Sequence, residues 1–335
     1  MTLTKKNVKT ILKKVSRSFY LSLRILPKKT RTPLALAYLL ARSADTITDT
    51  PVLPVQEKER FLSLLKNEIN GAWHEQKDWD HFFAQIISHQ NFTDEQKLLQ
   101  ELPNILKLFS ETDEKEKKLI RDVVLHLIGG MEKDLIRFAH ATKQNPVALE
   151  TEADLETYCF DAAGIVGPFW TQMLKLTFPL KIISENEVDQ WAIAYGKGLQ
   201  MTNVIKDLAC DLNMGRCYIP LEILKQFNLT PTNLKDPQNK PALDRLIENL
   251  IQRALGHLKY AAKYMEIIPR KHATTRLATL LPCMIGLETL RFLKEDPNLL
   301  DPTLPHKISR KTLKRVVITS CFLTFSHKLI QNSLK

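Results

Sequence analysis

The sequence predicts an all-α protein, and three observations support this fold class. Glycine accounts for only 10 of the 335 residues, about 3% against the roughly 7% that is typical. The one Asn-Gly dipeptide, Asn70-Gly71, follows a helical pattern and therefore predicts a helix end rather than a β-hairpin. Long Leu-, Lys- and Glu-rich segments repeat their apolar residues at helical spacing. With 44% hydrophobic residues, the chain can bury a sizeable core.

About ten helices are expected in chain order. Apolar periodicity predicts them over residues 4–26, 32–49, within 51–73, briefly within 72–92, and over 93–112, 114–139, 152–178, 185–212, 240–266, 273–295 and 309–332. Pro33 is expected in the first turn of its helix, where a missing N–H costs nothing. The segment 152–178 is nearly uncharged, so it is expected to be deeply buried.

The helices are expected to form a single domain over residues 1–335. The chain has no internal repeat and no low-complexity linker that would mark a boundary. Within this domain we expect a core at about 10–300 and a basic C-terminal helix at about 305–335.

The net charge of +11 permits a nucleic-acid, anionic-lipid or anionic small-molecule partner. Much of the excess lies in "KKNVKTILKKVSR" and "HKISRKTLKR" near the two ends. A helix-turn-helix, zinc or RNA-binding signature is missing, so nucleic acid is not expected as a partner. An anionic substrate, with a peripheral contact to a membrane surface, fits the charge better.

Cysteine usage and hydropathy predict a cytoplasmic protein. The five cysteines are odd in number and lack metal-ligand spacing, which favours ordinary thiols in a reducing compartment. We find no secretory signal and no apolar run of the roughly 18–20 residues that span a bilayer. The stretch "VVITSCFLTF" is about half that length, so it is expected to touch a membrane surface but not to cross it.

Two acidic pairs are the strongest functional signal. In "YLLARSADTITDT", Asp45 and Asp49 lie four residues apart, with Arg42 three residues before Asp45. Aspartates at this spacing share a helix face and repel each other. A lone pair of this kind is most often a solvated helix face.

A second pair weakens that ordinary interpretation. Asp207 and Asp211 are again four apart, and Gln200 and Asn203 extend the same face at 3–4 spacing. Carboxylates about 6 Å apart repel by roughly 3 kcal/mol at an effective dielectric constant of 20. A bridging Mg²⁺ would reverse this sign, and Mg²⁺ usually binds one or two carboxylates together with substrate phosphates. The two pairs therefore predict a magnesium–diphosphate site.

Three stretches resemble the signature regions of the squalene/phytoene synthases, the head-to-head prenyl transferases, and are most similar to squalene synthases. They are "SRSFYLSLRILPKKTRTPLALAYLLARSADTITDT", "YCFDAAGIVG" and "GLQMTNVIKDLACDLNMGRCYIP". The likeness covers about residues 16–220 and continues more weakly from "LATLLPCMIGLETL" to "HKISRK". Each motif alone is weak, but together they are specific.

The resemblance implies an isoprenoid-synthase helical bundle with a central cavity. In this family two farnesyl or two geranylgeranyl diphosphates bind. One ionises, and the double bond of the other attacks its allyl cation to give a cyclopropyl diphosphate. Squalene synthases then rearrange and reduce this product with NADPH, whereas phytoene and dehydrosqualene synthases lose a proton. A chain that stops at presqualene diphosphate is a third alternative, and a non-catalytic helical binding protein is a fourth.

The implied cofactors are Mg²⁺ and NADPH, the implied partners are prenyl diphosphates, and we expect a monomer. By resemblance, the metal-binding and catalytic aspartates are Asp45, Asp49, Asp207 and Asp211. The implied substrate contacts are Ser16, Arg17, Ser18, Phe19, Tyr38, Arg42, Gln200, Asn203, Arg216 and Tyr218.

Tyr158 resembles the catalytic tyrosine proposed to move a proton to or from diphosphate, and Lys307 and Arg310 in "KISRK" resemble part of a nicotinamide-cofactor site. Gly164 and Gly167 are expected to leave room for a prenyl chain.

Ordinary structural roles compete with several of these assignments. Ser16 could hydrogen-bond the local backbone, Arg17 could be a solvated charge, and Tyr158 could be a core residue. The chain also departs from the family pattern, because Ala278 aligns where many squalene synthases carry a phenylalanine. This departure weakens the case for the reductive step.

Overall fold

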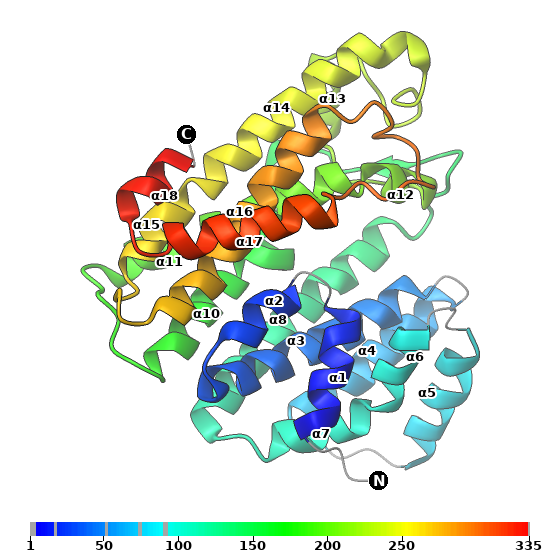
Figure 1. Ribbon diagram of the computed structural model, residues 1–335. Coiled ribbons are helices and arrows are strands. Elements are labelled where there is room, and N and C mark those ends of the chain that lie inside the picture. Colours follow the sequence, from blue (N-terminus) through cyan, green and yellow to red (C-terminus); the bar gives the residue numbers. More distant parts are fainter. Residues whose placement is uncertain (1–4, 17–18, 51–52, 73–75, 90–92, 334–335) are drawn as a thin grey trace. The chain divides into compact units, whose positions relative to one another are not determined.

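The computed structural model describes residues 5–16, 19–50, 53–72, 76–89 and 93–333 (Figure 1). These residues form 18 α-helices, a π-helical turn, a short 3₁₀ helix and a pair of two-residue strands. The predicted all-α fold is confirmed. Several expected helices are divided into shorter ones, which explains why there are more than the ten that periodicity indicated.

The chain divides into two compact units. Unit 1 contains Met1–Ile136 and Phe169–Pro179, and unit 2 contains Arg137–Pro168 and Leu180–Lys335. Among the described residues, no helix is long and apolar enough to cross a membrane.

Unit 1 is organised around its long third helix. Its helices are α1 (Lys5–Val15), α2 (Phe19–Ile25), α3 (Lys28–Asp49), α4 (Val55–Ile69), α5 (Gln76–His89), α6 (Thr93–Gln100), α7 (Leu102–Ser110) and α8 (Glu114–Arg137). Helix α3 packs against α1, α2, α4, α6 and α7. Leu39, Leu40, Ala44 and Ile47 of α3 have no exposed surface, so one face of this helix is fixed in the core.

The predicted position of Pro33 in a first helical turn is wrong. Helix α3 begins at Lys28, which places Pro33 inside the helix. The added turn is stabilised where the backbone N–H groups of Thr30 and Arg31 donate to the carbonyl of Pro27, at 3.1 and 2.9 Å.

Unit 2 contains the strand pair and most of the remaining helices. Its first elements are β1 (Val147–Ala148), α9 (Glu152–Cys159), the π-helical turn η1 (Phe160–Gly164), α10 (Val166–Lys175), which continues into unit 1, α11 (Glu185–Lys206), α12 (Leu208–Asn213) and β2 (Arg216–Cys217). The later elements are α13 (Leu221–Gln226), η2 (Pro237–Asn239), α14 (Lys240–Leu258), α15 (Tyr260–Glu266), α16 (Ala273–Lys294), α17 (Arg310–Leu323) and α18 (His327–Ser333).

Helix α11 lies at the centre of unit 2, in contact with α9, η1, α14, α15 and α16. Close helix packing, rather than space for a ligand, explains the glycines in this region. A Cβ on Gly167 would lie 2.3 Å from the carbonyl oxygen of Ala192, and a Cβ on Gly196 would lie 2.5 Å from that of Ala163. The interpretation that Gly167 leaves room for a prenyl chain is therefore wrong.

The segment 152–178 is less buried than its composition predicted. Cys159 and Gly164 are buried, whereas Ala162, Ala163 and residues 165–168 are half-buried. The π-helical turn also interrupts the expected continuous helix. The result is an apolar, partly accessible stretch with no charged side chain between Asp161 and Lys175.

Candidate functional site

In unit 1, the predicted residues of α3 lie on one face. Tyr38, Arg42, Asp45 and Asp49 follow 4-3-4 spacing and are half-buried or exposed, whereas all of the residues between them except Ala41 are buried. The core thus fixes the direction of this polar face, because the opposite side of the helix is packed on its neighbours. The predicted sharing of a face by Asp45 and Asp49 is consistent with this structure.

Arg42 is held between two carboxylates. Its guanidinium forms ion pairs with Asp45, one turn away on α3, and with Glu95 in the first turn of α6. The three side chains are 24%, 37% and 20% exposed, respectively. With Asp49 nearby, three carboxylates surround one guanidinium, so this face has an excess of negative charge.

The carboxyl group of Asp45 is hard to ionise. Burial, and then repulsion from Asp49, raise its pKa from 3.8 to about 6, while Arg42 acts in the opposite direction. A divalent cation would relieve the repulsion between the two aspartates. Hard oxygen donors and an excess of negative charge are the features that Mg²⁺ requires of a site.

The tyrosine of this face is joined to the end of α1. The hydroxyl of Tyr38 donates to the carbonyl of Val15 at 3.1 Å, and its ring lies 5.1 Å from the ring of Phe19. Ser16 is buried, and its hydroxyl donates to the carbonyl of Leu12. This is the local backbone role that competed with a substrate contact. Arg17 and Ser18 lie outside the described residues.

In unit 2, the predicted polar stripe forms a continuous hydrogen-bonded chain. The amide of Gln200 donates to the hydroxyl of Tyr158 at 2.9 Å. Asn203 donates to Gln200 at 3.4 Å, and Lys206 Nζ donates to Asn203 Oδ1 at 2.7 Å. The same ammonium lies 3.3 Å from Asp207 Oδ2. The chain therefore joins the tyrosine to the first acid of the second pair.

The helix that carries this stripe is broken at Asp207, where one helix over 185–212 was expected. Helix α11 ends at Lys206 and α12 begins at Leu208. Hydrogen bonds from Asp207 N to Asn203 O and from Asp211 N to Asp207 O, at 2.8 and 2.9 Å, continue through the break. The second acidic pair thus keeps its helical spacing, and the side chain of Asp207 is 48% exposed.

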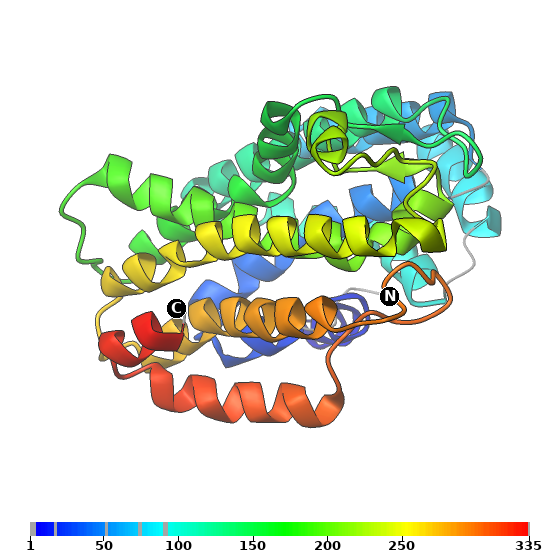
Figure 2. The ribbon, with the colours of Figure 1, turned by 90° about the horizontal axis from the view of Figure 1, so that it is seen from above.

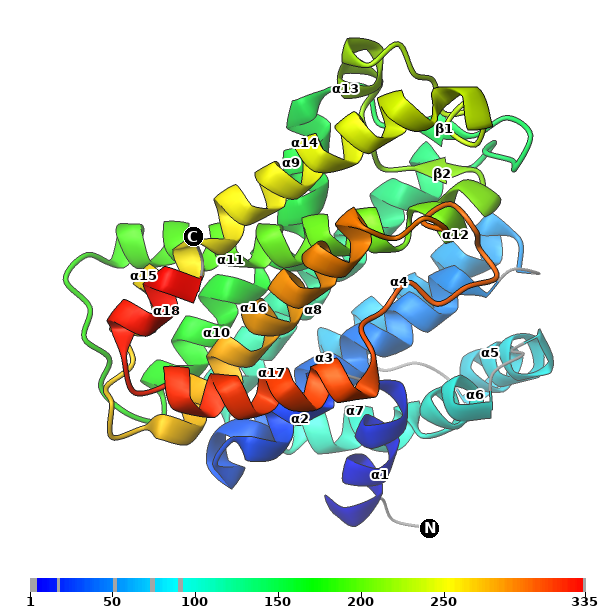
Figure 3. The same cartoon turned by 45° about the horizontal axis from the view of Figure 1, so that its top comes forward.

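An aromatic stack supports Tyr158. Its ring lies 4.2 Å from the ring of Tyr218, with 22° between the planes, and Phe138 packs edge-on against Tyr218 at 5.2 Å. Tyr218 directly follows β2, which pairs in parallel with β1 and places Arg216 opposite Val147 (Figure 3). The buried Tyr218 therefore serves as a platform for Tyr158, and Arg216 is half-buried beside it in the sequence.

The two predicted cofactor residues are on the surface of unit 2. Lys307 and Arg310 are exposed, and Arg310 is the first residue of α17. Ser309 caps this helix by accepting a hydrogen bond from Thr312 N at 3.0 Å. A role for these two cations in NADPH binding stays a prediction.

Each unit supplies one carboxylate pair, and the described residues contain no group of three or more His, Cys, Asp or Glu side chains arranged to hold a metal ion. Two carboxylates can still serve Mg²⁺, because the ion takes its other ligands from water and substrate phosphates. The metal-binding role of the four aspartates stays a prediction.

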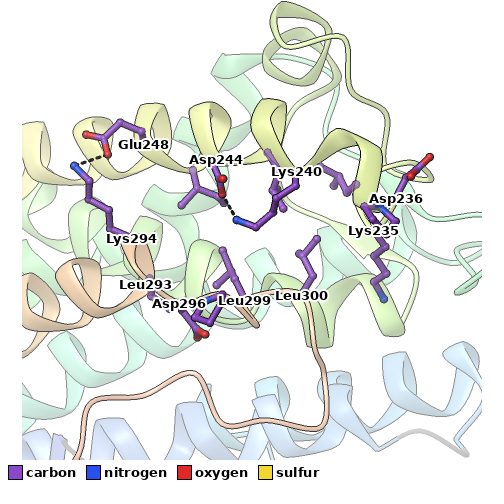
Figure 4. A pocket seen from close by; sticks show the side chains of 15 residues that line it. Lys235, Asp236, Lys240, Asp244, Glu248, Leu293, Lys294, Asp296, Leu299 and Leu300 are labelled. Carbon is purple, nitrogen blue, oxygen red and sulfur yellow. Dashed lines mark hydrogen bonds and ion pairs between the residues drawn. The ribbon is translucent and has the colours of Figure 1, made fainter.

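A pocket of about 450 Å³ in unit 2 contains none of the predicted residues (Figure 4). It lies between the beginning of α14 and the end of α16 and has a leucine-rich floor. One ion pair at the pocket joins Lys240 and Asp244 along α14, and a second joins Lys294 of α16 to Glu248 of α14. Its charges largely satisfy one another, so the pocket shows no preference for a charged ligand.

Glu95 and Lys206 were missed as members of the polar clusters. Glu95 stands in the acidic first turn of α6, where an acid is ordinary at a helix N-terminus, and it reaches Arg42 across 53 positions of sequence. The contact of Lys206 could have been predicted, since this residue lies three positions after Asn203 on the same helix. Only the second residue could have been found from spacing.

Comparisons with known proteins place these observations in a family context. The family model described as squalene/phytoene synthase matches residues 12–315. A squalene synthase from Botryococcus braunii, BSS, is 27% identical over 331 residues, which cover 95% of this chain and 67% of that protein. A squalene synthase from Eremothecium gossypii is 26% identical over 332 residues, covering 95% and 69%. A second Botryococcus braunii squalene synthase, LSS, is matched over only 52% of its length.

Two solved structures share the fold. A complex of TcSQS with a ligand superposes with a TM-score of 0.79 at 20% identity, covering 98% of this chain and 89% of that one. A dehydrosqualene synthase in complex with a ligand gives a TM-score of 0.66 at 22% identity and covers 94% of both chains. The predicted isoprenoid-synthase fold is confirmed.

Proposed function

This chain belongs to the squalene/phytoene synthase family, and we propose that it condenses two farnesyl diphosphates head to head to presqualene diphosphate and then reduces this product to squalene with NADPH. The names of the curated relatives favour squalene as the end product. The observation that carries the proposal is that each unit presents a pair of aspartates at four-residue spacing, on a polar face that includes a cation. In our proposal both pairs act on magnesium-bound diphosphate.

The first chemical demand is stabilisation of the departing diphosphate. Bound Mg²⁺ would neutralise charge that develops on this leaving group. Asp45 and Asp49 from α3, and Asp207 and Asp211 from α12 and the residue before it, would hold the ions. Arg42 keeps Asp45 in place through its ion pair.

The second demand is a proton transfer, because cyclopropane formation releases a proton from the carbon skeleton. The Tyr158 hydroxyl accepts a hydrogen bond from Gln200, which orients the hydroxyl hydrogen toward a different acceptor. In the proposed reaction this hydroxyl passes the proton to a diphosphate oxygen. The stack on Tyr218 fixes the ring, and the uncharged stretch from Ala162 to Pro168 excludes water from the allyl cation.

A second candidate product is dehydrosqualene or phytoene, formed without NADPH. Ala278 favours it, since this residue is buried in α16 and offers only a methyl group where the family resemblance leads us to expect an aromatic ring. An enzyme that releases presqualene diphosphate is the remaining alternative within the family.

One experiment separates these products. The purified protein is incubated with farnesyl diphosphate and Mg²⁺, with and without NADPH, and the products are identified by mass spectrometry. Squalene that forms only with NADPH supports the first proposal. Dehydrosqualene in both samples supports the second, and presqualene diphosphate in both supports the third. No product from either farnesyl or geranylgeranyl diphosphate would contradict the proposed chemistry and favour a binding protein.

A further inference from the structure

The last two helices of unit 2 expose an unusual row of large apolar side chains. Ile318, Phe322 and Phe325 are 60%, 73% and 60% exposed, and Leu329 of α18 is 49% exposed. Ile318 and Phe322 lie four residues apart on one side of α17, Phe325 follows in the turn after this helix, and Leu329 lies on α18. We call these four residues the apolar row. Contiguous exposed apolar surface of this kind marks an interaction site more often than scattered single residues do.

The opposite side of α17 is already used for packing. Val316, Ser320 and Leu323 are buried, and α17 contacts α16. In Figure 2, α17, drawn in red-orange, runs alongside α16 with its other side turned away from the rest of unit 2. The apolar row is therefore not needed to hold α17 in the fold.

Cations continue the same outward side toward the beginning of α17. Lys311 and Lys314 are exposed at three- and four-residue spacing before Ile318, and within the described chain neither forms an ion pair. Arg315 is exposed beside them and pairs with Glu288 of α16 at 3.0 Å. The outward side of α17 is thus basic in its first half and apolar in its second.

The charge of the whole segment is one-sided. Residues 302–335 contain seven of the chain's 48 Lys and Arg residues and none of its 37 Asp and Glu residues. A second copy of the chain would bring two such basic segments together, which is electrostatically unfavourable. A surface with dense negative charge and an apolar interior complements the segment in both respects.

We propose that α17 and α18 bind the surface of an anionic lipid bilayer. The apolar row inserts at the boundary between headgroups and acyl chains, and Lys311 and Lys314 contact headgroup phosphates. Helix α17 has 14 residues and is about 21 Å long, so its apolar end dips into the bilayer while its basic end stays at the headgroups. This contact does not depend on the proposed reaction.

Vesicle co-sedimentation tests the surface directly. The full chain is mixed with vesicles of 30% phosphatidylglycerol and 70% phosphatidylcholine, or with pure phosphatidylcholine, at low and high salt. We expect binding to the anionic vesicles only, and weaker binding at high salt. Phe322→Ser/Phe325→Ser and Lys311→Gln/Lys314→Gln should each lower the partition coefficient about tenfold or more.

Matched variants keep the test specific. Ile183→Ser removes an apolar side chain that is even more exposed than Phe322 and Phe325, and Lys225→Gln/Lys271→Gln removes two exposed cations elsewhere in unit 2. Both should bind vesicles like the original chain. Circular dichroism and the melting temperature check that every variant is folded. The proposal would be overturned if the control variants lost as much vesicle binding as the variants of the apolar row and of Lys311 and Lys314.

A probe on α17 gives a second, independent readout. Cys321 is exposed on this helix, whereas Cys159, Cys217 and Cys283 are buried. In a Cys210→Ser background, an environment-sensitive fluorophore on Cys321 should brighten and shift to shorter wavelength on anionic vesicles. Vesicle binding without this change would assign the contact to another face. A loss of dimers in the Phe322→Ser/Phe325→Ser variant, without any effect on vesicle binding, would assign the row to a second copy of the chain.

Discussion

The two predicted acidic faces are built differently. On α3 of unit 1, three carboxylates crowd one half-buried guanidinium, and the carboxyl group of Asp45 resists ionisation. On α11 and α12 of unit 2, Asp207 is more exposed and stands at the end of a hydrogen-bonded chain that begins at Tyr158. On the first face, repulsion between carboxylates remains that a cation can relieve, whereas on the second face two amides and the ammonium of Lys206 lie between an acid and a phenol. A metal site and a proton-transfer site need these two properties.

The largest expected effect is loss of turnover when either acidic pair is broken. Asp207→Asn and Asp45→Asn should each lower kcat about 10³-fold, because the diphosphate leaving group loses electrostatic stabilisation. Radiolabelled farnesyl diphosphate at saturating Mg²⁺ measures this loss. Asp244→Asn and Asp122→Asn remove aspartates from exposed ion pairs in the same two units and should keep nearly full activity.

The hydrogen-bonded chain of unit 2 is expected to matter next. Tyr158→Phe should lower kcat about 10²-fold through loss of a proton-transfer group, and Gln200→Leu about tenfold through loss of one hydrogen bond. The double variant should be no slower than Tyr158→Phe, because both act through one hydroxyl. Tyr260→Phe is the matched control. Rate losses that multiply in the double variant would show that Gln200 acts elsewhere.

Removal of the Arg42 guanidinium should destabilise unit 1, because the carboxylates of Asp45 and Glu95 then repel each other without a cation between them. Arg42→Met leaves Asp45 and Glu95 without their shared cation and should lower the free energy of unfolding by about 2 kcal/mol in metal-free protein. The comparison is Arg291→Met, whose exposed pair with Glu288 should be worth less than about 0.5 kcal/mol. Urea titrations measure both, and equal losses would show that the Arg42 cluster is an ordinary surface network.

The smallest expected effect is a pH-dependent change in the free energy of unfolding, and it has opposite signs at Asp45 and Glu156. Folding raises the pKa of Asp45 from 3.8 to about 6, so the folded chain binds more protons and loses stability as pH rises through this range. Metal-free Asp45→Asn should therefore be more stable than the original chain by about 1 kcal/mol at pH 7.5, a value reduced for the exposure of Asp45, and should gain little at pH 4.

Glu156 of unit 2 provides the opposite case. The hydrogen bond from His257, together with Lys197, lowers the pKa of Glu156 from 4.5 to about 2. Its stabilising contribution is complete above pH 4.5 and is lost as pH falls toward 2. Glu156→Gln should accordingly be less stable than the original chain at pH 7.5. Urea titrations in the presence of a chelator compare the two variants, and shifts of the same sign would contradict the assignment.

The same comparison shows what periodicity can and cannot predict. Contacts one helical turn apart can be predicted from the sequence, because their geometry follows from 3.6 residues per turn. Examples are the contacts of Arg42 with Asp45 and of Gln200 with Asn203. The contact of Glu95 with Arg42 could not be predicted from the sequence, since it depends on how α6 packs against α3. The break at Asp207 and the start of α3 before Pro33 were missed as well, because both depend on local hydrogen bonds that composition does not specify.

The central claim is that each acidic pair serves magnesium-bound diphosphate, and ligand binding tests it most directly. Isothermal titration measures Mg²⁺-dependent affinity for inorganic pyrophosphate in the original chain, in Asp45→Asn and in Asp207→Asn, with Asp122→Asn and Asp244→Asn as controls. We predict that Asp45→Asn and Asp207→Asn each weaken binding about tenfold or more, because each removes a carboxylate ligand of Mg²⁺. A variant of either pair that binds as well as the original chain would contradict the claim.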